Sequence, residues 1–559
     1  MDIFNKRPFK TINADKFDLE EVIKMFVNPL DALGDPFSFE SSIIKGEMGT
    51  GKTMYLRANH AIYDYQLLQS MINGEPLIIP IYIKLSDFSD SKDPRTIYQN
   101  IIKKLISELS KMYKKFADKE NFANIHKGIV NLPSTYFNYG VLSKIEEKVR
   151  KLDVEQYKEK ILKQLDTKCG LEHQLIKASA SYHNEKLVEI TERKDVSFAD
   201  LEKAYEWILR EGTDRILFLF DEAGSLSTKF FNEEGDSYFE ILMNQLRTLK
   251  ESEIKIAVYP HTASDKLKNV KFGQPIVLKE NIYNIDGYKK FRNKVIELVD
   301  RYLENYSINC KLHANNIFEM HESNEFGDSI EQLIFGSNGV MRYFVYYADI
   351  AMKICDSKNK SKIDKQDAIA ALTEAGNETK GRYGDRDQEF LDNIEKRLRA
   401  NKGTFKFRYL YKSLQLQKFI DKNNNQSIIR TVDSSSKKKG TVYSLDYAYC
   451  VSQNIATHYE KNSQKIDRER SYLTGEWISR LVTIKDNKDD IFEADVILIG
   501  TINFLLEDKT YVICENGEKY LLLKDNILNI EKGLKIGKQI EFTPLEIDGV
   551  KYCSHAKIL

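Results

Sequence analysis

One stretch of eight residues constrains this chain more than any other. It reads GEMGTGKT and fits the pattern G-x-x-x-x-G-K-[ST]. Glycines at these positions let the backbone approach crowded phosphate oxygens where a Cβ would clash. The N–H groups of the loop and the positive end of the following helix then face the phosphates. The pattern predicts a phosphate-binding loop formed by Gly46, Glu47, Met48, Gly49, Thr50, Gly51, Lys52 and Thr53.

Two side chains of this loop have specific tasks. Lys52 can reach the β- and γ-phosphates of a nucleotide, and the Thr53 hydroxyl can bind Mg²⁺. The surrounding sequence agrees, because the short apolar run 42–44 precedes the loop as a strand would, and residues 54–58 continue without glycine or proline as a helix would. A chance match is the alternative, expected in on the order of a few per cent of chains of this length.

A second element argues against a chance match. Residues 215–223 read RILFLFDEA, an apolar run that ends in two carboxylates. An all-apolar run is typical of a central parallel strand covered on both faces, and ligands of open α/β sheets bind at the carboxyl ends of such strands. We expect Asp221 to hold Mg²⁺ through water and Glu222 to polarise the attacking water. Alone, the run could equally be a buried strand followed by an acidic helix N-terminus.

Two further segments add candidate residues. Residues 254–262, IKIAVYPHT, predict another strand with a polar end, where His261 or Thr262 could contact the γ-phosphate or the attacking water; an ordinary turn is the alternative. Residues 335–344, FGSNGVMRYF, predict that one segment ends at glycines and that a helix begins near Arg342.

Together these segments resemble an AAA+ ATPase of the origin-recognition-complex-like group, which includes bacterial relatives from phage-defence loci. The resemblance extends over about the first 380 residues, from the run FVNPL at 26–30 to KIDKQDAI at 362–369. It implies that Lys52 and Thr53 bind ATP, that Asp221 and Glu222 serve Mg²⁺ and hydrolysis, and that Arg342 is a second sensor. It divides this part into a core (1–280) and a helical lid (281–384).

Two features depart from that family. Residues 95–200 separate the loop from the carboxylates, and their apolar spacing predicts a helical insertion, which is either a partner-binding element or mere elaboration. Such ATPases usually complete a neighbour's site with an arginine after the third strand, but residues 263–280 offer only Lys266, Lys268 and Lys271. Lysine lacks the planar fork that matches phosphate. Arg247 is a substitute, so homo-oligomerisation with a trans-acting arginine stays open.

The next region resembles a winged-helix domain (385–465). Helix-like segments contain Phe390 to Leu398 and then Tyr409 to Leu414, and two strands, 427–432 and 441–445, are joined by a basic turn. That turn contains Lys437, Lys438 and Lys439, which could contact nucleic-acid phosphates or merely be a solvated tip. The polar stretch 466–490 predicts a linker.

The last residues, 491–559, alternate apolar and polar positions through several short strands, which predicts a small β-barrel. This segment is similar to cold-shock or S1-type OB domains. Phe504, Tyr511 and Tyr520 are candidates for stacking on nucleic-acid bases. Leu521, Leu522 and Leu523 stand where such domains have more aromatics, so a protein-docking barrel is the alternative.

Composition limits the remaining choices. The chain has 559 residues with 84 Lys+Arg and 84 Asp+Glu, so any contact with nucleic acid must come from local patches. The N-terminus has no apolar signal-peptide core, no run is long enough to span a membrane, and 6 scattered cysteines fit a reducing cytoplasm.

The sequence thus predicts an α/β AAA+ ATPase core with a helical lid, a winged-helix-like domain and an OB-like barrel. We expect ATP and Mg²⁺ as cofactors and nucleic acid as partner, with a slow NTP-gated switch that controls an effector protein as the alternative.

Overall fold

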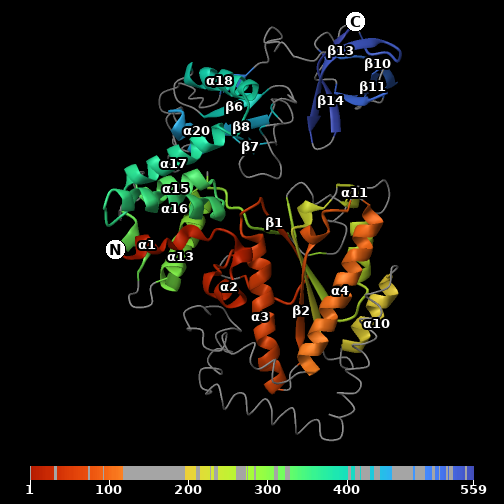
Figure 1. The fold of residues 1–559 in the computed structure, drawn as a ribbon, viewed down its shortest axis with the longest axis vertical. Coiled ribbons are helices and arrows are strands. Elements are labelled where there is room, and N and C mark those ends of the chain that lie inside the picture. The colour runs from red at the N-terminus through yellow and green to blue at the C-terminus, as the bar shows by residue number, and fades with distance from the viewer. Residues whose placement is uncertain are drawn as a thin grey trace. The chain divides into compact units, whose positions relative to one another are not determined.

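The structure of the chain is a computed structural model (Figure 1). It describes the chain except for residues 1, 31–33, 74–75, 92, 118–195, 209–214, 227, 232–236, 260–271, 273–274, 283–284, 307–311, 321–327, 401–404, 410–415, 417–418, 420–427, 434–440, 456–481, 485–497, 506–509, 515–516, 524–526, 528–532 and 548–549. The chain folds into two compact units. The first contains residues 1–282, 286–318 and 339–362, and the second contains 283–285, 319–338 and 363–559.

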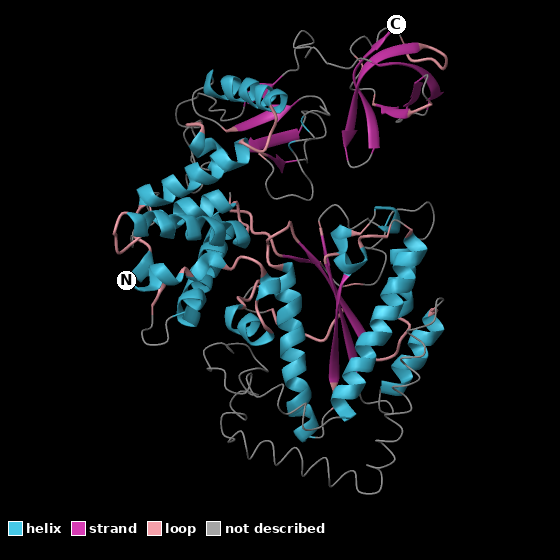
Figure 2. Cartoon of the chain, in the orientation of Figure 1, coloured by secondary structure: helices cyan, strands magenta, loops and turns pink. Residues whose placement is uncertain are grey.

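A five-stranded parallel sheet forms the centre of the first unit (Figure 2). Its strands are β1 (Ser42–Lys45), β2 (Ile78–Lys84), β3 (Arg215–Asp221), β4 (Ser252–Val258) and β5 (Ile276–Val277), in the spatial order β2-β3-β4-β1-β5. The apolar run of β3 is buried from Ile216 to Asp221, as the sequence predicted for a strand covered on both faces. Because all strands are parallel, their carboxyl ends lie at one edge.

Helices cover both faces of this sheet. In Figure 1, α3 (Lys52–Asn73) lies on one side, and α4 (Pro94–Ala117) and α10 (Phe198–Ile208) lie on the other. The predicted apolar face of α4 is confirmed, since Ile101, Leu105 and Leu109 are buried. Residues 118–195, the rest of the predicted insertion, lie outside the described residues. Shorter elements complete this part: η3 (Leu85–Phe88), η5 (Ala223–Ser225), α11 (Thr228–Phe231) and α12 (Tyr238–Leu246).

An N-terminal segment runs across this unit and is held at several points. It contains α1 (Asp2–Lys6), η1 (Pro8–Lys10), η2 (Ala14–Lys16) and α2 (Leu19–Met25). Arg7 binds the Asp349 carboxylate through two hydrogen bonds of 3.2 and 2.7 Å, and the Tyr302 hydroxyl donates to the carbonyl of Thr11 at 2.7 Å. The segment is therefore fastened to helices that lie far along the chain.

The predicted lid is helical. Its helices are α13 (Ile285–Tyr306), α14 (Ala314–Ile317), α15 (Ser329–Ser337), α16 (Met341–Ser357) and α17 (Lys365–Lys380). Packing places α13, α14 and α16 mainly in the unit of the parallel sheet, whereas α15 and α17 pack in the second unit with α20 (Tyr447–Ser452).

The second unit contains α18 (Asp385–Ala400) and a four-stranded sheet in the order β7-β8-β6-β9. Its strands are β6 (Lys406–Tyr409), β7 (Ile429–Asp433), β8 (Thr441–Leu445) and β9 (Val482–Ile484). The helix at 390–398 and the antiparallel β7–β8 pair are confirmed. The predicted helix through Tyr409, Leu410 and Leu414 is wrong at Tyr409, which pairs with Thr441 in the sheet, and Leu410 and Leu414 lie outside the described residues. Strand β9 lies within the segment predicted to be a linker.

The C-terminal strands close into a barrel, as predicted. They are β10 (Leu498–Leu505), β11 (Thr510–Cys514), β12 (Lys519–Leu522), β13 (Gln539–Ile547) and β14 (Val550–Ile558), in the order β10-β11-β12-β14-β13. Strands β12 and β14 are parallel, and the other neighbours are antiparallel. The barrel encloses its own apolar core, which includes Ile502, Val512 and Phe542.

Among the described helices, none is both long and apolar enough to cross a membrane. The four cysteines in the described part of the chain are buried and are not joined in disulfides.

Candidate nucleotide-binding site

The glycine-rich octet forms the loop between β1 and α3. Gly49 and Gly51 have φ values of +85° and +101°, in the left-handed region that other residues rarely adopt. The loop is closed by hydrogen bonds, with the Thr50 hydroxyl donating to the Glu47 carbonyl at 2.9 Å and the Tyr55 N–H to the Gly51 carbonyl at 2.8 Å. The octet thus has the strand–loop–helix context that its pattern predicted.

Lys52 lies at the first turn of α3 and is buried. Its ammonium group donates to the carbonyls of Gly46 and Glu47, both at 2.8 Å, and lies 4.2 Å from the centre of the Tyr259 ring. Burial lowers the pKa of Lys52 to about 8, an effect that Asp221 opposes. A cation that is short of water and surrounded by carbonyl dipoles and an aromatic face suits a phosphate anion.

Asp221 ends β3 beside the loop and is almost completely buried. Its Oδ2 accepts a hydrogen bond from the Tyr82 hydroxyl at 2.7 Å, and its Oδ1 accepts one from the Glu222 N–H at 2.8 Å. Burial raises the pKa of Asp221, whereas the hydroxyls of Tyr82 and Thr53 act in the opposite direction. The carboxylate and the Thr53 hydroxyl therefore lie together, as a shared Mg²⁺ site requires.

Glu222 follows directly and has an unusual backbone. Its φ of +56° places a residue other than glycine in the left-handed region, which costs of order 1–3 kcal/mol and is common at functional sites. The Lys84 ammonium lies 3.5 Å from both the Glu222 and Asp15 carboxylates. Burial alone would lower the pKa of Lys84, but the two carboxylates together raise it.

Tyr259 is a pocket residue that the sequence did not reveal. It follows β4, and its ring covers Gly224 so closely that a Cβ there would lie 1.9 Å from the Tyr259 Cδ2. Burial raises the pKa of Tyr259, and the carboxylates of Glu222 and Asp221 add to the effect. His261 and Thr262, the residues predicted for this place, lie outside the described residues. A tyrosine at a strand end is an ordinary core residue by sequence, so only its position identifies it.

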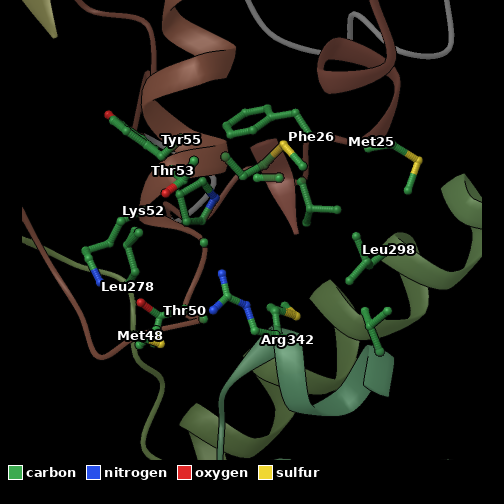
Figure 3. Close-up of a pocket in the computed structure, with 18 of the residues that line it drawn as sticks. Met25, Phe26, Met48, Thr50, Lys52, Thr53, Tyr55, Leu278, Leu298 and Arg342 are labelled. Carbon is green, nitrogen blue, oxygen red and sulfur yellow. The ribbon is translucent and has the colours of Figure 1, made fainter. Parts of the chain in front are cut away.

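Arg342 enters the same pocket from the start of α16 (Figure 3). Its backbone N–H donates to the Gly49 carbonyl at 3.1 Å, and a Cβ on Gly49 would lie 2.8 Å from the Arg342 Cβ. The turn before α16 uses two left-handed residues, Asn338 and Gly339, with φ values of +51° and +77°. The structure therefore brings the predicted sensor arginine to the loop.

The other half of the pocket is apolar. It is lined by the N-terminal segment and by lid helices, with Ile12, Phe17, Met25, Phe26, Val27, Phe291, Leu298, Met341 and Val345. At its edge, Lys294 donates to the Pro29 carbonyl and to the Glu280 carboxylate, both at 2.6 Å. An apolar lining beside a phosphate loop has the character expected for a nucleotide base.

The residues present fit a nucleotide with Mg²⁺. A Cβ on Gly46 would lie 2.2 Å from the Thr50 Oγ1, so the tight turn of the loop requires glycine there, and the positive φ of Gly49 and Gly51 requires glycine at those positions as well. Thr53 and Asp221 supply the oxygen ligands that Mg²⁺ prefers.

Arg247 is the predicted substitute for an arginine that acts in a neighbour's site, so its place outside this chain's own pocket leaves that prediction untested. Arg247 lies at the end of α12, is exposed, and is absent from the pocket lining. The lysines at 266–271 lie outside the described residues.

The strand order of the sheet, the phosphate loop, the carboxylate strand and the arginine of α16 define a parallel α/β core with one pocket at its phosphate loop. No protein-family model matches the chain, and no curated protein does. Three of the similar solved structures come from archaea. ORC1 of Aeropyrum pernix in complex with DNA has 12% identity and a TM-score of 0.30, covering 78% of this chain and 90% of its own.

Two more solved structures are comparable. ORC2 of Aeropyrum pernix, in ADPNP–ADP complexes, has 10% identity and a TM-score of 0.32 over 80% of this chain and 97% of its own. Cdc6p of Pyrobaculum aerophilum has 11% identity and a TM-score of 0.27 over 80% and 94%. Because these TM-scores are low, the description of the core as a parallel sheet with a phosphate-loop pocket depends only on its own strand order and pocket lining.

The candidate stacking residues of the barrel divide into two groups. Tyr520 is buried in the barrel core, where its ring packs on Phe542 at 5.0 Å between centroids, so its prediction as a surface stacking residue is wrong. Phe504 and Tyr511 are exposed, by 56% and 37%. Lys437, Lys438 and Lys439 lie outside the described residues.

The exposed aromatics belong to a row that the sequence did not show. Cross-strand pairs join Phe504 to Tyr511, Tyr511 to Leu521, and Leu521 to Tyr552. A bulge between Ile502 and Phe504 turns Phe504 to the outside, whereas strict alternation would have placed it in the core with Ile502. We call these four side chains the outer row.

Proposed function

We propose that the chain is a Mg²⁺-dependent ATPase that couples its nucleotide state to the binding of nucleic acid. The observation that carries the first half is the pocket itself. Lys52, Thr53, Asp221, Glu222 and Arg342 come from distant segments of the chain and line one cavity. A cluster of ion pairs that only stabilised the fold would not need a glycine-rich loop. Glycines with positive φ let the backbone N–H groups approach a bound phosphate, which supports a ligand-binding role.

Each residue has a task in this proposal. The loop N–H groups and Lys52 hold the phosphates, and Arg342 meets the terminal phosphate from the lid. Thr53 and Asp221 hold Mg²⁺, which when bound neutralises charge on the phosphates. Glu222 orients and polarises the attacking water, and the Lys84 ammonium keeps that carboxylate near the end of β3.

The apolar half of the pocket would hold the base. ATP rather than another nucleotide is the part of the proposal that comes from the resemblance to AAA+ ATPases. The N-terminal segment, α13 and α16 line this half, and all three belong to the first unit. A bound base would therefore contact the lid helices directly.

The barrel supports the second half of the proposal. Its closed five-stranded order, with β12 parallel to β14, supports an OB-like barrel, a fold that binds oligonucleotides on the face of its second and third strands. The outer row crosses that face, and Lys519 is exposed on the same strand as Leu521. Aromatic platforms of this kind stack with bases without sequence preference. The winged-helix-like assignment of residues 385–465, the defence role and homo-oligomerisation stay predictions.

The test is ATP hydrolysis by the full chain with Mg²⁺, alone and with duplex DNA, single-stranded DNA or RNA. We expect turnover that Glu222→Gln reduces by about 10²–10⁴-fold, while ATP binding by this variant persists, because only the water-polarising group is lost. Normal turnover by Glu222→Gln would remove Glu222 from the mechanism.

The three nucleic acids distinguish the two functions that the sequence left open. Stimulation by one of them supports the proposal and identifies the ligand class. Slow turnover that is indifferent to all three would overturn the nucleic-acid half and favour a nucleotide-gated switch with a protein partner.

A further inference from the structure

Strand β2 contributes a side chain to the pocket's carboxylate that no sequence motif indicates. Strand β2 runs parallel to β3, with Lys84 opposite Asp221 and Tyr82 opposite Leu219. Two residues before the strand end, the Tyr82 hydroxyl reaches Asp221 Oδ2 at 2.7 Å. The bond has the usual length of an O–H···O hydrogen bond and joins neighbouring strands of the central sheet, so its geometry is set by rigid elements.

The two oxygens of Asp221 have different donors. Oδ2 takes the Tyr82 hydroxyl, and Oδ1 takes the N–H of Glu222 at 2.8 Å. With both oxygens held, the plane of the carboxylate is determined. If the Tyr82 hydroxyl were absent, Oδ2 would lose that donor, and only the Glu222 N–H and the Thr53 hydroxyl would remain to orient the carboxylate.

The Tyr82 ring also contacts helix α3. His60 of α3 stacks on it, with ring centroids 5.7 Å apart and an interplanar angle of 20°. Helix α3 begins with Lys52 and Thr53, so the same helix that presents the metal-binding hydroxyl also restrains the ring that orients the metal-binding carboxylate. The contact of His60 with Tyr82 and the hydrogen bond of Tyr82 to Asp221 therefore link α3, β2 and β3 next to the proposed Mg²⁺ site.

We propose that Tyr82 is a positioning residue that orients Asp221 for Mg²⁺. The inference rests on the proposed function. Tyr82 does not line the pocket; in this proposal it acts through Asp221 as an outer partner of a metal ligand. Such partners fix ligand orientation, and their removal typically lowers metal affinity by about 10–100-fold. The competing explanation is that Tyr82 is an ordinary buried tyrosine whose hydroxyl bonds to the nearest acceptor.

The variant Tyr82→Phe separates the two explanations, because it removes one oxygen atom and keeps the ring. ATP binding to the full chain is measured by calorimetry in EDTA, and Mn²⁺ binding to the ATP complex is measured by electron paramagnetic resonance. We expect the Mn²⁺ dissociation constant to rise by about 10-fold, while the affinity for metal-free ATP changes by less than about twofold. Metal-free ATP binding also reports that the variant is folded.

The chain offers a matched control in Tyr98→Phe. Tyr98 also donates its hydroxyl to a side-chain oxygen, that of Gln245, but neither residue lines the pocket. This variant should leave both affinities unchanged, and Asp221→Asn should lose Mn²⁺ more completely than Tyr82→Phe.

Three outcomes decide the matter. Unchanged Mn²⁺ affinity in Tyr82→Phe would overturn the inference and leave the proposed function intact. Equal losses of metal-free and Mn²⁺-dependent binding would also overturn it, because the hydroxyl would then support the fold of the site rather than the metal. Absence of ATP binding by the unsubstituted chain would overturn the proposed function instead.

Discussion

Lys52 is the residue whose replacement tests the phosphate loop most directly. We expect Lys52→Ala to lower ATP affinity by at least about 100-fold, because a charge-assisted bond to phosphate is lost inside a buried site. Calorimetry with ATP measures this effect.

The control for Lys52 is Lys279→Ala. Lys279 pairs with Glu47 of the same loop at 2.6 Å, but its side chain is 31% exposed. Exposed pairs contribute about 0–1 kcal/mol, so ATP affinity should change little. Tight ATP binding by Lys52→Ala would show that the octet does not hold phosphate.

Lys255 allows a prediction about pH. It is buried in β4, where its ammonium donates to the Asn59 side chain at 2.7 Å and to the Pro36 carbonyl at 3.3 Å. Burial lowers the pKa of Lys255 to about 7, although Asp35 and Glu40 oppose the effect. An unfolded lysine keeps its proton up to about pH 10.4. Above pH 7 the unfolded chain therefore binds a proton that the folded chain has lost, so this residue makes stability rise with pH.

The variant Lys255→Met removes that dependence. At pH 6 the folded chain carries the cost of a buried charge, so we expect the methionine variant to be the more stable of the two. Its advantage should shrink between pH 7 and 10, at up to about 1.4 kcal/mol per pH unit. Thermal unfolding of both proteins across this range measures the difference. A difference that is constant with pH would mean that Lys255 keeps its ordinary pKa.

The individual residues of the site were only partly predictable from sequence. Lys52, Thr53, Asp221 and Glu222 could be predicted because phosphate and Mg²⁺ impose residue types at fixed spacings. Tyr82, Lys84 and Tyr259 carry no such pattern, since each acts through its place in the sheet. Their position beside the carboxylates follows from the β2-β3-β4 strand order, which sequence spacing does not contain.

At the scale of elements, the hydrophobic pattern predicted a helix or strand wherever the same face of the segment is buried along its whole length. The apolar run of β3 and the apolar faces of α4 and α18 were predicted because burial extends along each of them. Tyr409 was assigned to a helix together with Leu410 and Leu414, whose positions fit a helical spacing. In the structure β6 ends at Tyr409, and pairing with β8 outweighs that weak local preference. Strand β9 is three residues long, too short for its alternation to be recognised.

The turn between α15 and α16 decides where Arg342 lies. Gly339 has a φ of +77°, and a Cβ there would lie 2.5 Å from the Glu280 carbonyl oxygen. We expect Gly339→Ala to destabilise the chain by more than about 1 kcal/mol and to weaken ATP binding, because relief of the clash displaces α16 from the loop. Thermal unfolding and ATP calorimetry measure the two effects.

Gly537→Ala separates the cost of the dihedral angle from the cost of the clash. Gly537 has a similar φ of +87°, but no atom lies within 4 Å of a Cβ built there. This variant should lose some stability and bind ATP normally. Unchanged ATP binding by Gly339→Ala would show that the turn does not position Arg342.

At the scale of the whole molecule, the first unit joins distant parts of the chain around one pocket. The N-terminal segment lines the base half and is fastened to α16 through Arg7 and to α13 through Thr11. Near Asp15 it also meets Lys84, which pairs with Glu222. The N-terminal segment thus contacts the lid helices, the apolar half of the pocket and Lys84, the ion-pair partner of Glu222, within one packed unit.

The outer row of the barrel carries the prediction about nucleic acid. Phe504 and Tyr511 are paired, exposed and adjacent to Leu521. If bases stack there, each aromatic contributes about 1–3 kcal/mol by alanine substitution. We therefore expect Phe504→Ala and Tyr511→Ala each to weaken binding of single-stranded oligonucleotide to the full chain by about 5–150-fold. Both variants should hydrolyse ATP normally without nucleic acid, since neither residue lines the nucleotide pocket.

Ile536→Ala is the matched control, because Ile536 is also a large exposed apolar residue of the barrel, at 65%, but lies outside the outer row. Fluorescence anisotropy with labelled single-stranded DNA, RNA and duplex DNA at two salt concentrations measures all three variants. Stacking predicts that the losses persist at high salt, because only the phosphate contribution is screened. Equal binding by all variants would exclude the outer row as the nucleic-acid surface. Its apolar side chains would then fit better with docking of a protein partner, whose capture should depend on Phe504 and Tyr511 but not on Ile536.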